Sequence, residues 1–204
     1  QIARNLFLLE YTGGKLHIPT ISTAKSVVLI KEAKARGLSV SCSAAVHHLV
    51  LTDEKLEGFD TRYKVTPPLR TEQDRKALIE GILDGTIDMI TSDHNPIDIE
   101  HKKMEFDAAK NGTIGLESAF GSLMSILPLE IIIEKLTAGK TTFGIESTII
   151  TEGAKASLSL FSPEENNTFI KTSILSKSKN SAFLGIEMQG TVYGIVNQDQ
   201  LILV

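Results

Sequence analysis

The sequence predicts an α/β protein, and its alternating strand and helix patterns support this fold class. Short apolar, β-branched segments at 15–21, 38–45 and 87–91 are typical of strands. Segments with helical spacing of apolar residues lie between them at 23–36 and 71–83, with Ser22 and Thr71 placed to cap them. Repeated strand–helix units of this length favour a parallel sheet with right-handed crossovers.

The two ends of the chain have different characters. A helix is expected over 3–11, ended by Gly13 and Gly14, and two more are expected over 115–127 and 129–138. After Gly144, short alternating runs at 157–161, 168–170, 190–196 and 201–204 replace the helical periodicity. The sequence therefore predicts βα units over 1–145 and a small β domain over 146–204.

Composition excludes several classes of protein. The chain has 204 residues, a net charge of -4 and no basic stripe, so nucleic acid is not an expected partner. The longest apolar run, 127–133, is interrupted by Glu130 and is too short to span a bilayer. The single cysteine, Cys42, rules out an internal disulfide and fits a reducing cytoplasm, where we expect it to be a buried filler.

Polar residues follow each predicted strand: Thr20 after the first, His47 and His48 after the second, and Asp93 after the third. A carboxylate at this end of a parallel strand can bind a metal ion or accept a proton, and Asp93 can equally well cap a turn. Adjacent histidines on an extended segment point to opposite sides. We therefore expect one of His47 and His48 to be structural and the other exposed.

Six segments, taken in order, resemble the dihydroorotase family of the amidohydrolase superfamily. Residues 16–23 resemble a family segment that usually reads His-x-x-His-x-Ser-Thr, and residues 92–97 resemble one that ends Thr-Asp-His-Ala-Pro-His. Residues 84–88, Asp-Gly-Thr-Ile-Asp, belong with 92–97 to one segment, and the other four matching segments are 46–53, 64–70, 112–117 and 176–185. The resemblance implies the C-terminal portion of a (β/α)8 TIM barrel of the metal-dependent hydrolase type, plus a small β unit, with the first strands expected before Gln1.

The resemblance also implies a chemistry. The family uses zinc to interconvert two small molecules of pyrimidine biosynthesis, carbamoyl aspartate and dihydroorotate. By this resemblance Asp93 is the catalytic proton acceptor and a metal ligand, while Asn111 and Gly112 are substrate-binding positions. Zinc suits such a reaction because it lowers the pKa of bound water and polarises a carbonyl group.

Three positions depart from the family pattern. Thr20 stands where the family has a histidine zinc ligand, Thr66 where it has a substrate-binding asparagine, and Ile97 where it has a substrate-binding histidine. A hydroxyl is a poor replacement for imidazole as a ligand of zinc. We therefore expect an eroded site, absent or weak zinc binding, and no activity of this chain alone.

Three functional hypotheses remain open on the sequence. The first is a dihydroorotase-like amidohydrolase acting on a small-molecule substrate. The second is a non-catalytic dihydroorotase homologue that is a structural partner of aspartate carbamoyltransferase. The third is an amidohydrolase whose altered pocket takes another substrate. A homo-oligomer is compatible with each.

Overall fold

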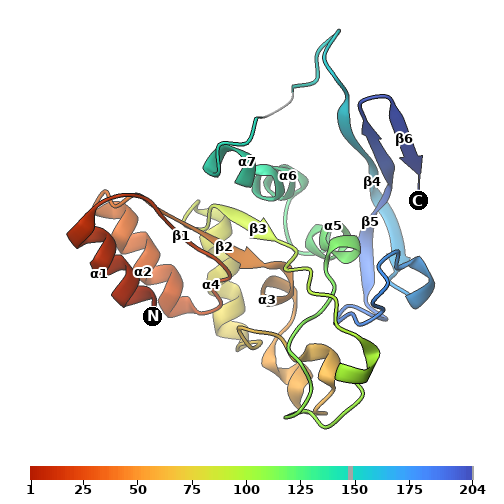
Figure 1. Cartoon of the computed structure of the whole chain (residues 1–204), viewed down its shortest axis with the longest axis horizontal. Coiled ribbons are helices and arrows are strands. Elements are labelled where there is room, and N and C mark those ends of the chain that lie inside the picture. Colours follow the sequence, from red (N-terminus) through yellow and green to blue (C-terminus); the bar gives the residue numbers. More distant parts are fainter. Residues whose placement is uncertain (147–148, 204) are drawn as a thin grey trace.

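The computed structural model describes residues 1–146 and 149–203 (Figure 1). The helices and strands are, in chain order, α1 (Ile2–Thr12), β1 (Leu16–Ile18), α2 (Ala24–Ala35), β2 (Val40–Ala45), α3 (Val46–Val50), α4 (Glu72–Leu83), β3 (Met89–Thr91), α5 (Leu116–Met124), α6 (Leu129–Thr137), α7 (Gly139–Thr142), β4 (Ser157–Thr168), β5 (Glu187–Asn197) and β6 (Gln200–Leu203). Four short 3₁₀ turns lie at 53–56, 61–63, 99–101 and 171–173.

The first three strands form a parallel sheet in the order β1-β2-β3, as the sequence predicts. Leu16 pairs with Val40, and Ser43 pairs with Met89, so the strands are adjacent and their carboxyl ends lie together. Strand β1 is shorter than predicted. Pro19 follows its last residue, and a proline has no N–H to donate to a neighbouring strand.

Helices α2 and α4 pack together on the sheet. Thr71 caps α4 as predicted, its hydroxyl accepting the Asp74 N–H at 3.3 Å. The expected cap of α2 is wrong by one residue: Thr23, not Ser22, accepts the Ser26 N–H at 3.2 Å. Ser22 is instead buried and precedes Thr23, the N-cap residue, whose own backbone is extended.

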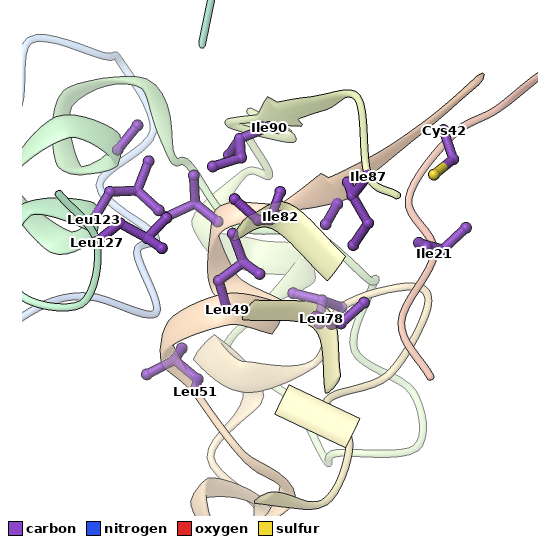
Figure 2. Close-up of a cluster of buried hydrophobic side chains, with 14 of the residues drawn as sticks. Ile21, Cys42, Leu49, Leu51, Leu78, Ile82, Ile87, Ile90, Leu123 and Leu127 are labelled. Carbon is purple, nitrogen blue, oxygen red and sulfur yellow. The ribbon is translucent and has the colours of Figure 1, made fainter. Parts of the chain in front are cut away.

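One hydrophobic core lies between the sheet and its helices (Figure 2). Its fully buried members include Cys42 of β2, Leu49 of α3 and Ile82 of α4. Leu123 of α5 belongs to the same cluster, so the core continues from the parallel sheet towards the C-terminal part of the chain. Burying each such aliphatic side chain stabilises the fold by about 1.5–3 kcal/mol.

The C-terminal part is a second, antiparallel sheet in the order β4-β5-β6. Figure 1 places it across the molecule from α1 and α2. Helix α5 packs against β5, and a Cβ on Gly121 would lie 3.0 Å from Met188 Cβ, so the contact is close. The predicted β character is confirmed, whereas the domain boundary at 145/146 stays a prediction.

A helix that crosses a membrane must be long and predominantly apolar. Within the described ranges, every helix is too short or too polar to cross a bilayer.

Candidate active site

The tips of the parallel strands converge as the sequence predicts. Thr20 follows β1, His47 lies in the helix that follows β2, and Asp93 follows β3. His47 Nε2 lies 3.9 Å from Asp93 Oδ2, although the two residues are far apart in the sequence. The edge formed by these carboxyl ends is therefore the candidate site.

Asp93 is held between the core and solvent. Its N–H donates to Thr91 Oγ1 at 3.2 Å, and its side chain is 37% exposed. Burial raises the pKa of the Asp93 carboxyl above its ordinary value. Its backbone has a φ of 44°, in the left-handed region that a non-glycine residue rarely adopts. Such strain is typical of a residue whose position is fixed by its surroundings.

The prediction for the two histidines is wrong in two respects. Both lie in the short helix α3 and not on an extended segment, and both are buried. Their ring centroids are 4.3 Å apart, which the 100° step of a helix allows and an extended chain does not. His48 Nε2 donates to Pro67 O at 2.9 Å, so His48 is the structural member of the pair.

His47 has no hydrogen-bond partner on either ring nitrogen among the described residues. Burial, together with neighbouring His48, keeps the pKa of His47 well below its ordinary value, so the ring is neutral. A neutral imidazole carries one N–H that needs an acceptor. The Asp93 carboxylate lies beyond hydrogen-bond distance, 3.9 Å from His47 Nε2.

Thr20 also has a left-handed backbone, with a φ of 53°. Its N–H donates to Ser43 Oγ at 3.3 Å, and the same hydroxyl lies 3.4 Å from His17 Nε2. His17 Nδ1 lies 2.9 Å from Ser41 Oγ, and burial lowers the pKa of this histidine. Polar groups that face this part of the sheet are therefore bonded mainly to one another.

The two predicted substrate-binding positions lie beside the site. Asn111 is exposed, and its carbonyl accepts from Asn95 Nδ2 at 3.5 Å. Gly112 is buried, with its N–H donating to Lys64 O at 2.9 Å and its carbonyl accepting from Asn180 Nδ2 at 3.0 Å. Because its N–H is already used, Gly112 has no free backbone donor for a substrate.

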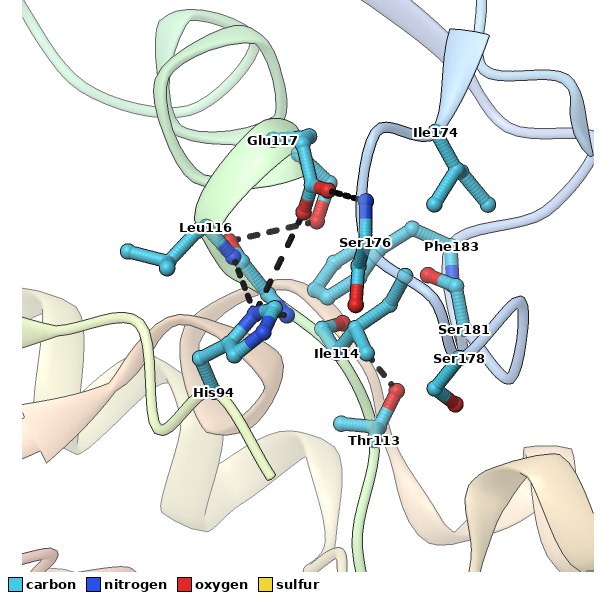
Figure 3. A network of polar contacts seen from close by, with 12 residues as sticks. His94, Thr113, Ile114, Leu116, Glu117, Ile174, Ser176, Ser178, Ser181 and Phe183 are labelled. Atoms are coloured by element: carbon cyan, nitrogen blue, oxygen red, sulfur yellow. Dashed lines mark hydrogen bonds and ion pairs between the residues drawn. The ribbon is translucent and has the colours of Figure 1, made fainter. Parts of the chain in front are cut away.

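A polar network behind Asp93 was not predicted from the sequence (Figure 3). His94 Nδ1 accepts the N–H groups of Gly115 and Leu116 at 3.3 Å each, where α5 begins. A nitrogen that accepts two hydrogens carries no proton, so the 4.0 Å approach of Glu117 Oε2 is not an ion pair. Glu117 Oε1 accepts the Ser176 N–H at 2.8 Å. The network therefore ties the C-terminal part to the segment that carries Asp93.

The described residues do not by themselves fit a zinc ion. A structural or catalytic zinc takes three or four protein ligands, about 2.0–2.3 Å from the metal. No group of three or more histidine, cysteine or acidic side chains is placed to hold an ion in the described part of the chain. Asp93 and His47 are one pair of possible ligands, and the tip of β1 adds only the hydroxyl of Thr20.

Curated relatives identify the family. The dihydroorotase of Pelotomaculum thermopropionicum is 39% identical over 215 residues, which cover 99% of this chain and 50% of that protein. The dihydroorotase of Geobacter metallireducens is 39% identical over 194 residues, covering 92% and 46%. The chain belongs to the dihydroorotase family. It spans about half the length of the curated dihydroorotases it matches. No family model matches the sequence.

Solved structures agree with the fold of a dihydroorotase. The L-hydantoinase of Arthrobacter aurescens superposes with a TM-score of 0.90 at 25% identity, covering 99% of this chain and 48% of that one. The inactive dihydroorotase-like domain of the Chaetomium thermophilum CAD-like multifunctional protein has a TM-score of 0.74 at 21% identity, covering 98% and 54%. The predicted fold class is confirmed: part of an amidohydrolase (β/α)8 barrel with an additional β unit.

Proposed function

We propose that this chain is the Asp93-bearing part of a dihydroorotase-like amidohydrolase whose site is eroded, and that the chain alone does not catalyse the family reaction. One observation carries the proposal. Asp93 follows β3 with a strained backbone at the edge where the strand tips meet, and the tip of β1 carries Thr20, where the family resemblance would place a histidine. A threonine hydroxyl cannot replace a neutral imidazole in binding zinc.

The remaining departures point in the same direction. Ile97 is half-buried beside Gly112 and has no polar atom on its side chain, so it cannot hydrogen-bond to a substrate carboxylate. Thr66 is exposed. Each lost polar contact to a charged substrate weakens binding by about 1.5–3 kcal/mol. Asp93 can still accept a proton, because its carboxylate is partly exposed and lies beside the neutral His47.

The test measures zinc and activity together. The purified chain is dialysed and analysed for bound metal, and cyclisation of carbamoyl aspartate is assayed with and without added zinc. We expect less than one zinc per chain and no turnover, and we expect Thr20→His to add affinity without creating activity. The opposite result, one zinc per chain with turnover that Asp93→Ala abolishes and Asp107→Ala does not, would overturn the proposal.

A second candidate is a non-catalytic homologue that binds aspartate carbamoyltransferase. It is favoured by the departures from the family pattern at Thr20, Thr66 and Ile97, and by the likeness in fold to a domain named as inactive within a multifunctional protein. Sedimentation of the chain mixed with aspartate carbamoyltransferase tests it: a faster-sedimenting complex supports the partnership, and independent sedimentation of the two proteins excludes it. Either function, and the single cysteine, fit the cytoplasm, which we propose as the location.

A further inference from the structure

A pocket rich in basic side chains lies between residues 97–103 and 171–184. Its volume is about 640 Å³, and apolar atoms of Ile97, Ile99 and Leu184 form part of its wall. The wall also contains two carboxylates, Asp98 and Glu100, and six cationic side chains: Arg62, Lys102, Lys103, Lys171, Lys177 and Lys179. The chain as a whole has a net charge of -4, so this pocket opposes the overall charge.

The buried Lys102 is the main reason to expect a ligand. The residue is only 3% exposed, and its Nζ donates to Lys110 O at 2.9 Å and to Lys64 O at 3.3 Å. No carboxylate lies within ion-pair distance of it in the residues that the structure describes. Burial, with the charge of Lys64, lowers the pKa of Lys102 to about 8. A buried charge without a counter-ion is unfavourable, and a bound anion would compensate it.

Three other cations of the pocket are available to a ligand. Arg62 is held by Asp60 at 2.6 and 2.8 Å, and Lys179 donates to a backbone carbonyl. For Lys103, Lys171 and Lys177, by contrast, the described residues provide no side-chain hydrogen bond or ion pair. These three ammonium groups come from both walls of the pocket, so an elongated anion can reach all of them.

We propose that this pocket binds the phosphate chain of a small molecule. A volume of about 640 Å³ far exceeds what one phosphate occupies, and cations on two facing segments match several linked phosphates better than a single one. The apolar part of the wall leaves room for an organic group. The pocket shares Ile97 with the family's substrate-binding positions, but none of its cationic side chains is one of them, so the proposal requires neither zinc nor the amidohydrolase reaction.

Calorimetric titration of the full chain with inorganic pyrophosphate tests the proposal. We expect saturable binding of one pyrophosphate per chain, weakened by salt. The double variant Lys171→Gln/Lys177→Gln should bind roughly tenfold or more weakly, because it removes two charge-assisted contacts. The matched control is Lys25→Gln/Lys55→Gln, which removes the same charge from exposed lysines outside the pocket and should retain the affinity.

Three results would overturn the proposal: no saturable binding, equal weakening in both double variants, or unchanged binding when Lys103→Gln is added to the pocket variant. Thermal unfolding with and without pyrophosphate supplies a second readout, and only variants that unfold like the parent chain are compared. Titration with adenosine diphosphate distinguishes the source of the phosphates. Tighter binding than pyrophosphate indicates a nucleotide-like ligand on the apolar wall, and equal binding indicates a free phosphate chain.

Discussion

Replacing Cys42 with alanine should remove a loss of stability that the chain suffers at alkaline pH. Cys42 is fully buried in β2 (Figure 2), and its thiol donates weakly to Thr86 O at 3.6 Å. Burial, followed by the charge of Asp88, raises the pKa of this thiol from 9.0 to about 12. The folded chain therefore keeps the proton over a pH range in which the unfolded chain releases it.

The sign follows from this difference. Below the unfolded pKa of 9.0 both states hold the proton, and the thiol causes no pH dependence. As the pH rises above 9.0 the unfolded state is favoured progressively, until the folded thiol also ionises near pH 12. At about pH 10.5 the resulting loss in the free energy of unfolding is about 2 kcal/mol.

Urea unfolding at about pH 8 and about pH 10.5 measures this loss in the parent chain and in Cys42→Ala. The small cavity left by the substitution lowers the free energy of unfolding by the same amount at both pH values. Its effect therefore cancels when the loss between the two pH values is compared. The parent should lose about 2 kcal/mol more than the variant between the two pH values. Equal losses in the two proteins would refute the reasoning, because other titrating groups are common to both.

Three further substitutions should lower the free energy of unfolding, each measured in urea against the parent chain. Gly112→Ala should cost about 1–3 kcal/mol, because φ is 140° there and a Cβ would lie 2.9 Å from Ile97 Cγ1. Thr113→Val should cost about 1–3 kcal/mol, because it leaves the buried Ala182 N–H, now 2.8 Å from Thr113 Oγ1, without an acceptor. Leu49→Ala should cost about 2–5 kcal/mol by leaving a cavity in the core. A change below about 0.5 kcal/mol in any of them would contradict its reason.

The parallel sheet and the convergence at its edge could be predicted, because they depend on local patterns. Short, largely apolar segments indicate β2 and β3. Polar residues directly after them, among them Asp93, indicate where the strands end. Helix α3 could not be predicted, because five residues contain too few turns to show helical periodicity. The burial of His47 follows from that helix and was missed for the same reason.

The network around α5 depends on contacts that no local pattern reveals. Glu117 accepts from Ser176, and Thr113 accepts from Ala182, across separations of 59 and 69 residues. The family segments that contain these residues are recognisable in the sequence, yet their spacing does not say that they meet. Their contact becomes evident only once the second sheet is placed against α5 (Figure 3).

The backbone at Thr20 is held in place by bonds that do not involve its side chain. A β-branched residue at a φ of 53° is strained, by about 1–3 kcal/mol, and such a conformation persists only where the surroundings fix it. Here the Thr20 N–H donates to Ser43 Oγ, and the next N–H, of Ile21, donates to Ser43 O at 2.9 Å. Both bonds use backbone N–H groups of the segment that follows β1, and neither uses the Thr20 side chain. A side chain of another type at position 20 should therefore leave these two backbone bonds to Ser43 of β2 in place.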